Sequence, residues 1–217
     1  MVRTLSNEAG VRRRLPLVVE QGLASTRLAK AALSESFILK VGIDNTTCRK
    51  GCAHCCYYPL TLSLWEGITV YQGLKASGLW TSDLKQRLEH HSTLTLGTAP
   101  EVWLLSSIPC PLLEDNLCTV HDHRPFRCRV TASSGDPEHC RPVRFGPHTF
   151  EDNRWEDTEF RAVEAAAARD CRDHVRGLDE RVPLSTAVLV GYGIVEETIA
   201  LDEVPRTLLK MLGEDSR

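Results

Sequence analysis

Eight of the nine cysteines in this chain lie between residues 48 and 140, and this clustering constrains the fold more than any other feature. Such a cysteine density is typical of secreted domains stapled by disulfides, or of proteins that hold metal through thiolates. Near the start, a short basic run precedes an apolar stretch that is too short for a signal peptide. We therefore expect a cytoplasmic protein whose cysteines bind metal or carry out redox chemistry.

Length and charge exclude several other classes of protein. The 217 residues fit one domain, or one domain with helical extensions. The net charge of -3 gives no electrostatic reason to expect a nucleic-acid partner. No apolar run approaches the roughly 18–20 residues of a membrane span, so we expect no membrane partner either.

Hydrophobic periodicity predicts a mainly helical chain. Residues 15–33 have the pattern of an amphipathic helix, and residues 37–43 alternate like a short strand. Ser63 and Glu66 have the spacing of a capping box, which predicts a helix over 64–76 with Gly78 near its end. Ser82 is the expected cap of a second helix over 82–90. Residues 94–100 resemble a loop, and 102–108 a strand or a buried helical turn.

The second half of the chain divides into an irregular part and a helical part. Residues 109–147 hold six prolines and four cysteines, so we expect little regular structure there and a metal to order it. The pattern of residues 157–176 predicts an alanine-rich helix. Pro183 is expected near the start of a further helix. The predicted class is α+β, mainly helical, with an irregular cysteine-rich metal-binding core flanked by N- and C-terminal helices. The expected divisions are 1–36, 37–150 and 151–217: an N-terminal extension, a metal-binding domain, and C-terminal helices packed on that domain.

Spacing makes the cysteines candidate metal ligands. The run CRKGCAHCC at 48–56 brings cysteines four and three residues apart, around a glycine that permits a tight turn. The adjacent Cys55 and Cys56 point in different directions in either helix or strand, so one is a bystander or they serve two centres. The candidate ligands are Cys48, Cys52, Cys55, Cys56, Cys110, Cys118, Cys128 and Cys140.

The spacing favours an iron–sulfur cluster over zinc. Structural zinc usually takes paired knuckles, whereas the second half of this set has wide spacings. Iron–sulfur clusters accept a compact run with one distant ligand, and we expect Cys48, Cys52, Cys55 and Cys128 to share one centre. Basic residues flank many of the cysteines, and positive neighbours lower the pKa of thiols. Arg124 and Arg129 are the predicted cofactor-binding arginines, which would orient the ligand loop.

These motifs resemble the YkgJ-type cysteine-cluster family, described as a zinc- or iron-chelating domain. The matching pieces are CRKGCAHCC at 48–56, CPLLEDNLC at 110–118 and CTVHDHRPFRCR at 118–129. The last piece is similar to the family signature CxxYxxRPxxCR, with His121 in the position of the tyrosine. The resemblance covers residues 48–140 and implies a metal-binding fold. It does not assign a reaction, although a flagellin lysine methylase carries a related cysteine cluster.

Three functions remain open from the sequence. A binding or assembly module would use the metal to order a surface for a protein partner. An iron–sulfur enzyme is the second, because the 48–55 spacing is that of radical S-adenosylmethionine enzymes; His54 replaces the usual aromatic residue, and no barrel pattern follows. A thiol-redox protein is the third, through Cys52 and Cys55, but no thioredoxin-like pattern surrounds them.

Overall fold

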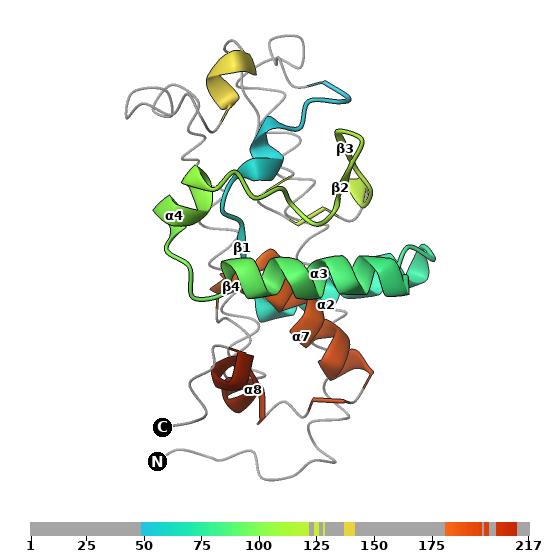
Figure 1. Ribbon diagram of the computed structural model, residues 1–217. Coiled ribbons are helices and arrows are strands. Elements are labelled where there is room, and N and C mark those ends of the chain that lie inside the picture. Colours follow the sequence, from blue (N-terminus) through green and yellow to red (C-terminus); the bar gives the residue numbers. More distant parts are fainter. Residues whose placement is uncertain are drawn as a thin grey trace, which may run out of the picture.

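The computed structural model describes residues 49–121, 124–125, 128, 137–141, 181–196, 198–199 and 203–211 (Figure 1). The helices predicted over 15–33 and 157–176 and the strand over 37–43 lie outside these residues. So do Cys48 and Arg129 among the candidate site residues.

Helix α2 (Leu64–Ala76) begins and ends where local signals predict. Ser63 is its N-cap residue in extended backbone, although its side chain makes no capping hydrogen bond. At the other end Gly78 has a φ of 68°, and the amides of Gly78 and Leu79 donate to the carbonyls of Lys75 and Leu74. This is the Schellman arrangement, in which a left-handed glycine satisfies the last carbonyls of a helix.

Helix α3 (Ser82–Thr95) is longer than predicted, and its cap is a different residue. Thr81, not Ser82, is the N-cap: its hydroxyl accepts from the amide of Leu84 at 3.1 Å. The helix continues five residues past His90 because Leu88 and Thr95 are buried in the molecule, and burial extends a helix beyond its local signals.

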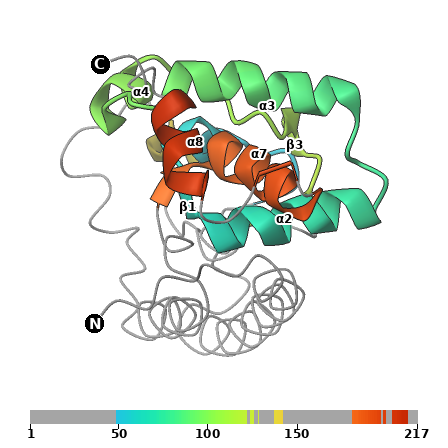
Figure 2. The same cartoon turned by 90° about the horizontal axis from the view of Figure 1, so that it is seen from below.

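Helix α7 (Leu184–Val195) packs against both α2 and α3 (Figure 2). Strand β4 (Arg181–Pro183) precedes it and pairs antiparallel with β1 (Thr61–Ser63), which precedes α2. The helices α2 and α7 cross very closely. A Cβ atom added to Gly67 would lie 2.2 Å from the carbonyl oxygen of Ala187, and one on Gly191 would lie 2.6 Å from the amide nitrogen of Ile68. The two glycines therefore permit this crossing.

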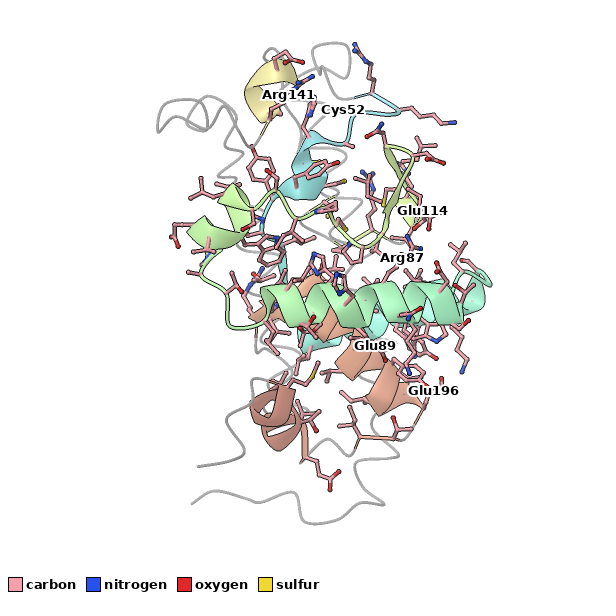
Figure 3. The ribbon with its side chains drawn as sticks, viewed as in Figure 1. Cys52, Arg87, Glu89, Glu114, Arg141 and Glu196 are labelled. Carbon is pink, nitrogen blue, oxygen red and sulfur yellow. The ribbon has the colours of Figure 1, made fainter. Side chains whose placement is uncertain are left out.

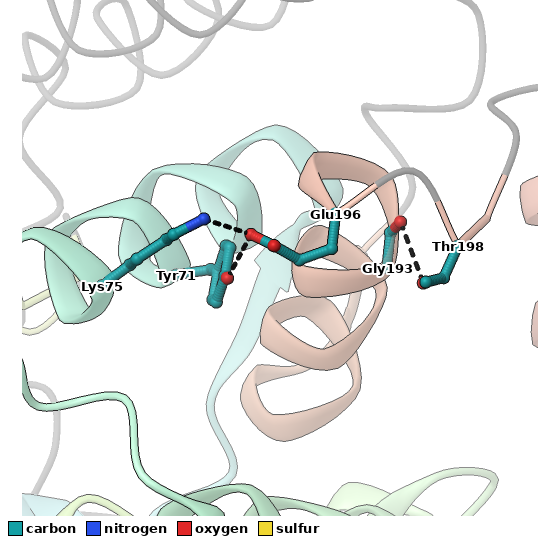
Figure 4. Close-up of polar contacts among 5 residues, drawn as sticks. All are labelled: Tyr71, Lys75, Gly193, Glu196 and Thr198. Atoms are coloured by element: carbon teal, nitrogen blue, oxygen red, sulfur yellow. Dashed lines mark hydrogen bonds and ion pairs between the residues drawn. The ribbon is translucent and has the colours of Figure 1, made fainter.

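Polar contacts join the far ends of α2 and α7 (Figure 4). The Tyr71 hydroxyl and the Lys75 ammonium both donate to one carboxylate oxygen of Glu196, each at 2.6 Å. Beside them, the hydroxyl of Thr198 donates to the carbonyl of Gly193 at 3.2 Å. These contacts hold the crossing angle of the two helices.

The remaining elements are short. They are the helices α4 (Pro100–Leu105) and α8 (Val204–Met211), the hairpin strands β2 (Leu113–Glu114) and β3 (Leu117–Cys118), and the 3-10 turns η2 (His54–Tyr57) and η4 (Pro137–Cys140). Residues 102–108 are thus partly helical rather than a strand, with Trp103 buried. In Figure 1, η2, the hairpin and η4 lie on one side of α3, and α7 and α8 on the other.

The core lies between α2, α3 and α7, and it is built from aliphatic side chains with one tyrosine. Its fully buried members include Leu62, Leu64, Ile68, Tyr71, Leu74, Leu88, Leu112, Leu184 and Val188. The prediction of a mainly helical α+β fold is confirmed. Among the residues that the structure describes, no helix has both the length and the apolar content to cross a membrane.

Candidate metal centre

The first cysteine cluster lies on a tight loop that leads into η2. Gly51 has a φ of 87°, a conformation that side chains disfavour, and the amide of Cys52 donates to the carbonyl of Arg49 at 2.9 Å. The chain then enters η2, which carries Cys55 and Cys56. Figure 3 labels Cys52 on the loop above this turn. The turn predicted from the glycine is therefore present.

A backbone hydrogen bond joins the first cluster to the second. The amide of Cys110 donates to the carbonyl of Cys56 at 2.7 Å, although 54 positions separate the two residues. Proline follows Cys110, and the amide of Leu113 then donates back to the Cys110 carbonyl at 3.0 Å. The second cluster therefore starts directly beside η2.

The hairpin of β2 and β3 brings Cys118 back toward Cys110. Its two turn residues, Asp115 and Asn116, have φ values of 49° and 61°, as a type I′ turn requires, and aspartate and asparagine tolerate this conformation well. The register places Leu113 opposite Cys118. An ion pair between Arg87 and Glu114, both labelled in Figure 3, fastens the hairpin to α3.

The thiols of the two clusters perturb one another. Burial, with smaller contributions from the neighbouring Cys118 and Cys55, raises the pKa of Cys110 to about 12, although a backbone hydrogen bond at Leu112 opposes the shift. Burial also raises the pKa of Cys128 well above its ordinary value, as do Cys110, Cys55, Glu66 and Cys118. Thiolates this close repel one another, so Cys110 and Cys128 stay protonated until a cation supplies positive charge. The donor set fits a thiophilic metal.

The adjacent Cys55 and Cys56 have opposite properties. A hydrogen bond from the Cys56 thiol lowers the pKa of Cys55 to about 7, against the effect of burial. The same hydrogen bond, with burial, raises the pKa of Cys56. Both residues therefore belong to one group of thiols, and Cys55 is the one that ionises near neutral pH.

Arg124 lies beside this group of thiols. Its Nε donates to the carbonyl of His121 at 3.0 Å, within the segment that leads to Cys128. Its positive charge lowers the pKa of Cys55 and, against the larger effect of burial, that of Cys118. The guanidinium is thus held by a backbone carbonyl of its own segment, and its positive charge favours the thiolate forms of Cys55 and Cys118.

Cys140 reaches the first cluster through its backbone. The hydroxyl of Tyr58 donates to the carbonyl of Cys140 at 3.1 Å, and η4 packs against η2. At the end of η4, a 2.9 Å ion pair joins Glu138 to Arg141, which is labelled in Figure 3. Cys140 is therefore held against η2, the turn that carries Cys55 and Cys56.

The structure describes seven of the eight candidate ligands, and none of the seven forms a disulfide. Within the described ranges, no three Cys, His, Asp or Glu side chains are arranged closely enough to hold a metal ion. Because Cys48 is outside those ranges, the grouping of Cys48, Cys52, Cys55 and Cys128 stays a prediction. The described thiols gather in one region, and a metal would have to draw its ligands together there.

Sequence reasoning did not identify two residues of this region. Tyr58 was not singled out, although its position two residues after Cys56 was a signal. Glu66 has the spacing of a capping box, but it is only 8% exposed, and its negative charge raises the pKa of Cys128. His91, by contrast, lies in the helical core, where its Nδ1 is 2.9 Å from the hydroxyl of Ser185.

Comparison with known proteins gives one match. No curated protein and no solved structure was found to match the chain. The model of one protein family matches residues 47–165, which is more than half of the chain and includes both cysteine clusters. The chain belongs to that family, CxxCxxCC, which is described as "Putative zinc- or iron-chelating domain".

Proposed function

We propose that this chain is a metal-binding module in which cysteine thiolates hold an iron–sulfur cluster, with a zinc centre as the alternative. The observation that carries the proposal is the 2.7 Å hydrogen bond from the Cys110 amide to the Cys56 carbonyl. It brings the two cysteine clusters together, and the family description supports zinc or iron as the metal. Compact and distant cysteines on one centre are the pattern of iron–sulfur ligation.

Three of the described thiols, Cys110, Cys118 and Cys128, resist ionisation because burial raises their pKa values, so a metal is needed to displace their protons. Burial keeps Cys110 and Cys128 protonated, and thiolates at these positions would repel the neighbouring ones. A metal ion or cluster displaces these protons and neutralises the charge. The guanidinium of Arg124 would offset part of the negative charge that remains on the metal-bound thiolates. A module of this kind would act on another protein, so a protein partner is part of the proposal.

A thiol-redox protein is the second candidate function. The contact between the Cys55 and Cys56 thiols and the pKa of about 7 at Cys55 favour it, because a thiolate is the reactive form of cysteine. The two candidates differ in what the purified protein contains. A redox protein would carry no stoichiometric metal and would form a disulfide on mild oxidation.

The test is anaerobic purification of the full chain, followed by metal and acid-labile sulfide analysis and a visible spectrum. Iron with sulfide and a coloured protein is the expected result. A colourless protein with stoichiometric zinc would establish the alternative metal. Neither metal in stoichiometric amount, together with a disulfide after oxidation, would replace the metal proposal with the redox one.

A further inference from the structure

We propose that Tyr58 is the positioning residue that holds Cys140 at the metal centre. The proposal rests on the proposed metal-binding function and deepens it, because it assigns a role to a side chain that is not a ligand. The Tyr58 hydroxyl donates to the carbonyl of Cys140 at 3.1 Å, across 82 positions of sequence. Such a contact places the backbone of one candidate ligand directly against the cysteine turn.

Tyr58 has a fixed place relative to the first cluster. It is the C-cap residue of η2, and its own amide donates to the carbonyl of Cys55 at 3.3 Å. The two turns that it joins, η2 and η4, also pack against each other. The ring thus spans the space between the turn that carries Cys55 and the turn that carries Cys140.

The other end of the contact is also well defined. Cys140 ends the short η4 turn, where the amide of Arg141 donates to the carbonyl of Glu138 at 3.2 Å and their side chains form an ion pair. The hydrogen bond to the Cys140 carbonyl therefore positions the whole η4 turn against η2, rather than a single flexible residue. A turn docked in this way brings its cysteine to the centre with less loss of conformational entropy on metal binding.

The test is Tyr58→Phe, which keeps the ring and removes the donor. Tyr57→Phe removes the hydroxyl of the neighbouring ring in η2 and is the matched control. Alkylation of each cysteine by iodoacetamide is followed by mass spectrometry in the full chain, before and after removal of metal with a chelator. Metal affinity is measured in parallel by competition between Zn²⁺ and a coloured chelator.

We expect metal to protect Cys140 from alkylation in the wild type and in Tyr57→Phe. In Tyr58→Phe, metal should still protect Cys55 and Cys110 but no longer Cys140, and affinity should fall about 10-fold. Cys140→Ser should lose a similar factor. The double variant Tyr58→Phe with Cys140→Ser should lose no more than Cys140→Ser alone, because both changes remove the same ligand.

Two results would overturn the inference, and they are distinguishable. Equal protection of Cys140 by metal in the wild type and Tyr58→Phe would show that Tyr58 does not position it, while the metal-binding proposal would stand. A tyrosine with a purely structural role would lower the thermal stability of the metal-free protein and leave the Cys140 protection intact. Absence of metal-dependent protection at every cysteine of the wild type would overturn both proposals.

Discussion

The backbone amide of Cys110 donates to the carbonyl of Cys56 at 2.7 Å, so the two cysteine clusters meet through the main chain. A main-chain contact does not depend on the protonation or metal loading of the thiols. The main chain alone therefore places the two clusters side by side. The backbone brings the two clusters together, but the thiol groups must still move closer to bind a single metal centre.

Replacing Cys110 or Cys128 should remove metal. We expect Cys110→Ser and Cys128→Ser each to lower the metal content of the anaerobically purified protein at least several-fold, because serine is a poor ligand for soft metals. Cys171→Ser changes the ninth cysteine, outside the cluster, and is the control. Full metal content in both Cys110→Ser and Cys128→Ser would exclude these residues as ligands.

Removing the metal should weaken the fold around the cysteines. The second cluster lies on a hairpin whose strands have two residues each, and Leu112 and Val120 anchor it to the core. Metal-binding free energy should add to this small set of contacts. We expect chelation to lower or broaden the thermal transition measured by circular dichroism, and added Zn²⁺ or reconstitution to restore it. An unchanged transition after verified metal removal would contradict this prediction.

Arg124 should matter for its geometry as well as its charge. Arg124→Lys keeps the charge but loses the planar fork that donates to the His121 carbonyl. We expect both Arg124→Lys and Arg124→Ala to lower metal affinity by roughly 10–100-fold, as loss of groups that orient ligands does. Arg181→Lys is the control, since Arg181 also donates to a carbonyl, that of Thr61, in the β1–β4 pair. Unchanged metal affinity in both variants would show that Arg124 acts only as a surface charge, whose interactions contribute under about 1 kcal/mol to stability.

The close crossing of α2 and α7 should tolerate no side chain at Gly67. A Cβ there would meet the backbone of Ala187, which cannot rotate away, so Gly67→Ala should lower the free energy of unfolding by about 3 kcal/mol. Gly78→Ala tests the other kind of glycine, because nothing lies near its missing Cβ and its φ is 68°. That variant should lose about 1 kcal/mol. Urea denaturation compares the two, and equal losses would contradict the packing argument.

Buried His91 should make stability depend on pH. Burial, and then the neighbouring His90, lowers the pKa of His91 to about 4 from an ordinary 6.5. The unfolded chain therefore takes up this proton at higher pH than the folded chain does. The free energy of unfolding should fall as pH drops from 6.5 toward 4, by about 2 kcal/mol at pH 5.

The comparison of His91→Asn with the wild type isolates this effect from other acid-sensitive groups. The difference in unfolding free energy between the two proteins should shrink by that amount between pH 7 and pH 5. His90→Gln, at an exposed position of α3, should keep most of the wild-type slope. Parallel pH profiles for His91→Asn and the wild type would show that His91 does not titrate in this window.

The sequence alone determined what local chemistry controls. The bounds of α2 match the positions of Ser63 and Gly78, although Ser63 makes no capping hydrogen bond, and α7 starts directly after Pro183, because helix ends are set by residues within one turn. The spacing at 48–56 and the family resemblance indicated a metal centre, and the comparison with the family model confirmed the family. The N-cap of α3 is Thr81 rather than the predicted Ser82. The two hydroxyl residues are adjacent, and the local sequence does not distinguish which of them caps the helix.

Tertiary structure decided everything that joins distant parts of the chain. The Cys110–Cys56 hydrogen bond, the contact of Tyr58 with Cys140 and the burial of Glu66 near Cys128 each depend on how the elements pack. Residues 102–108 had too few positions for periodicity to separate a strand from a helix, and packing around Trp103 settled the helix. Spacing along a chain limits which cysteines can meet, but the packed helices and the hairpin determine which of them do, because loop closure leaves many pairings nearly equal in free energy.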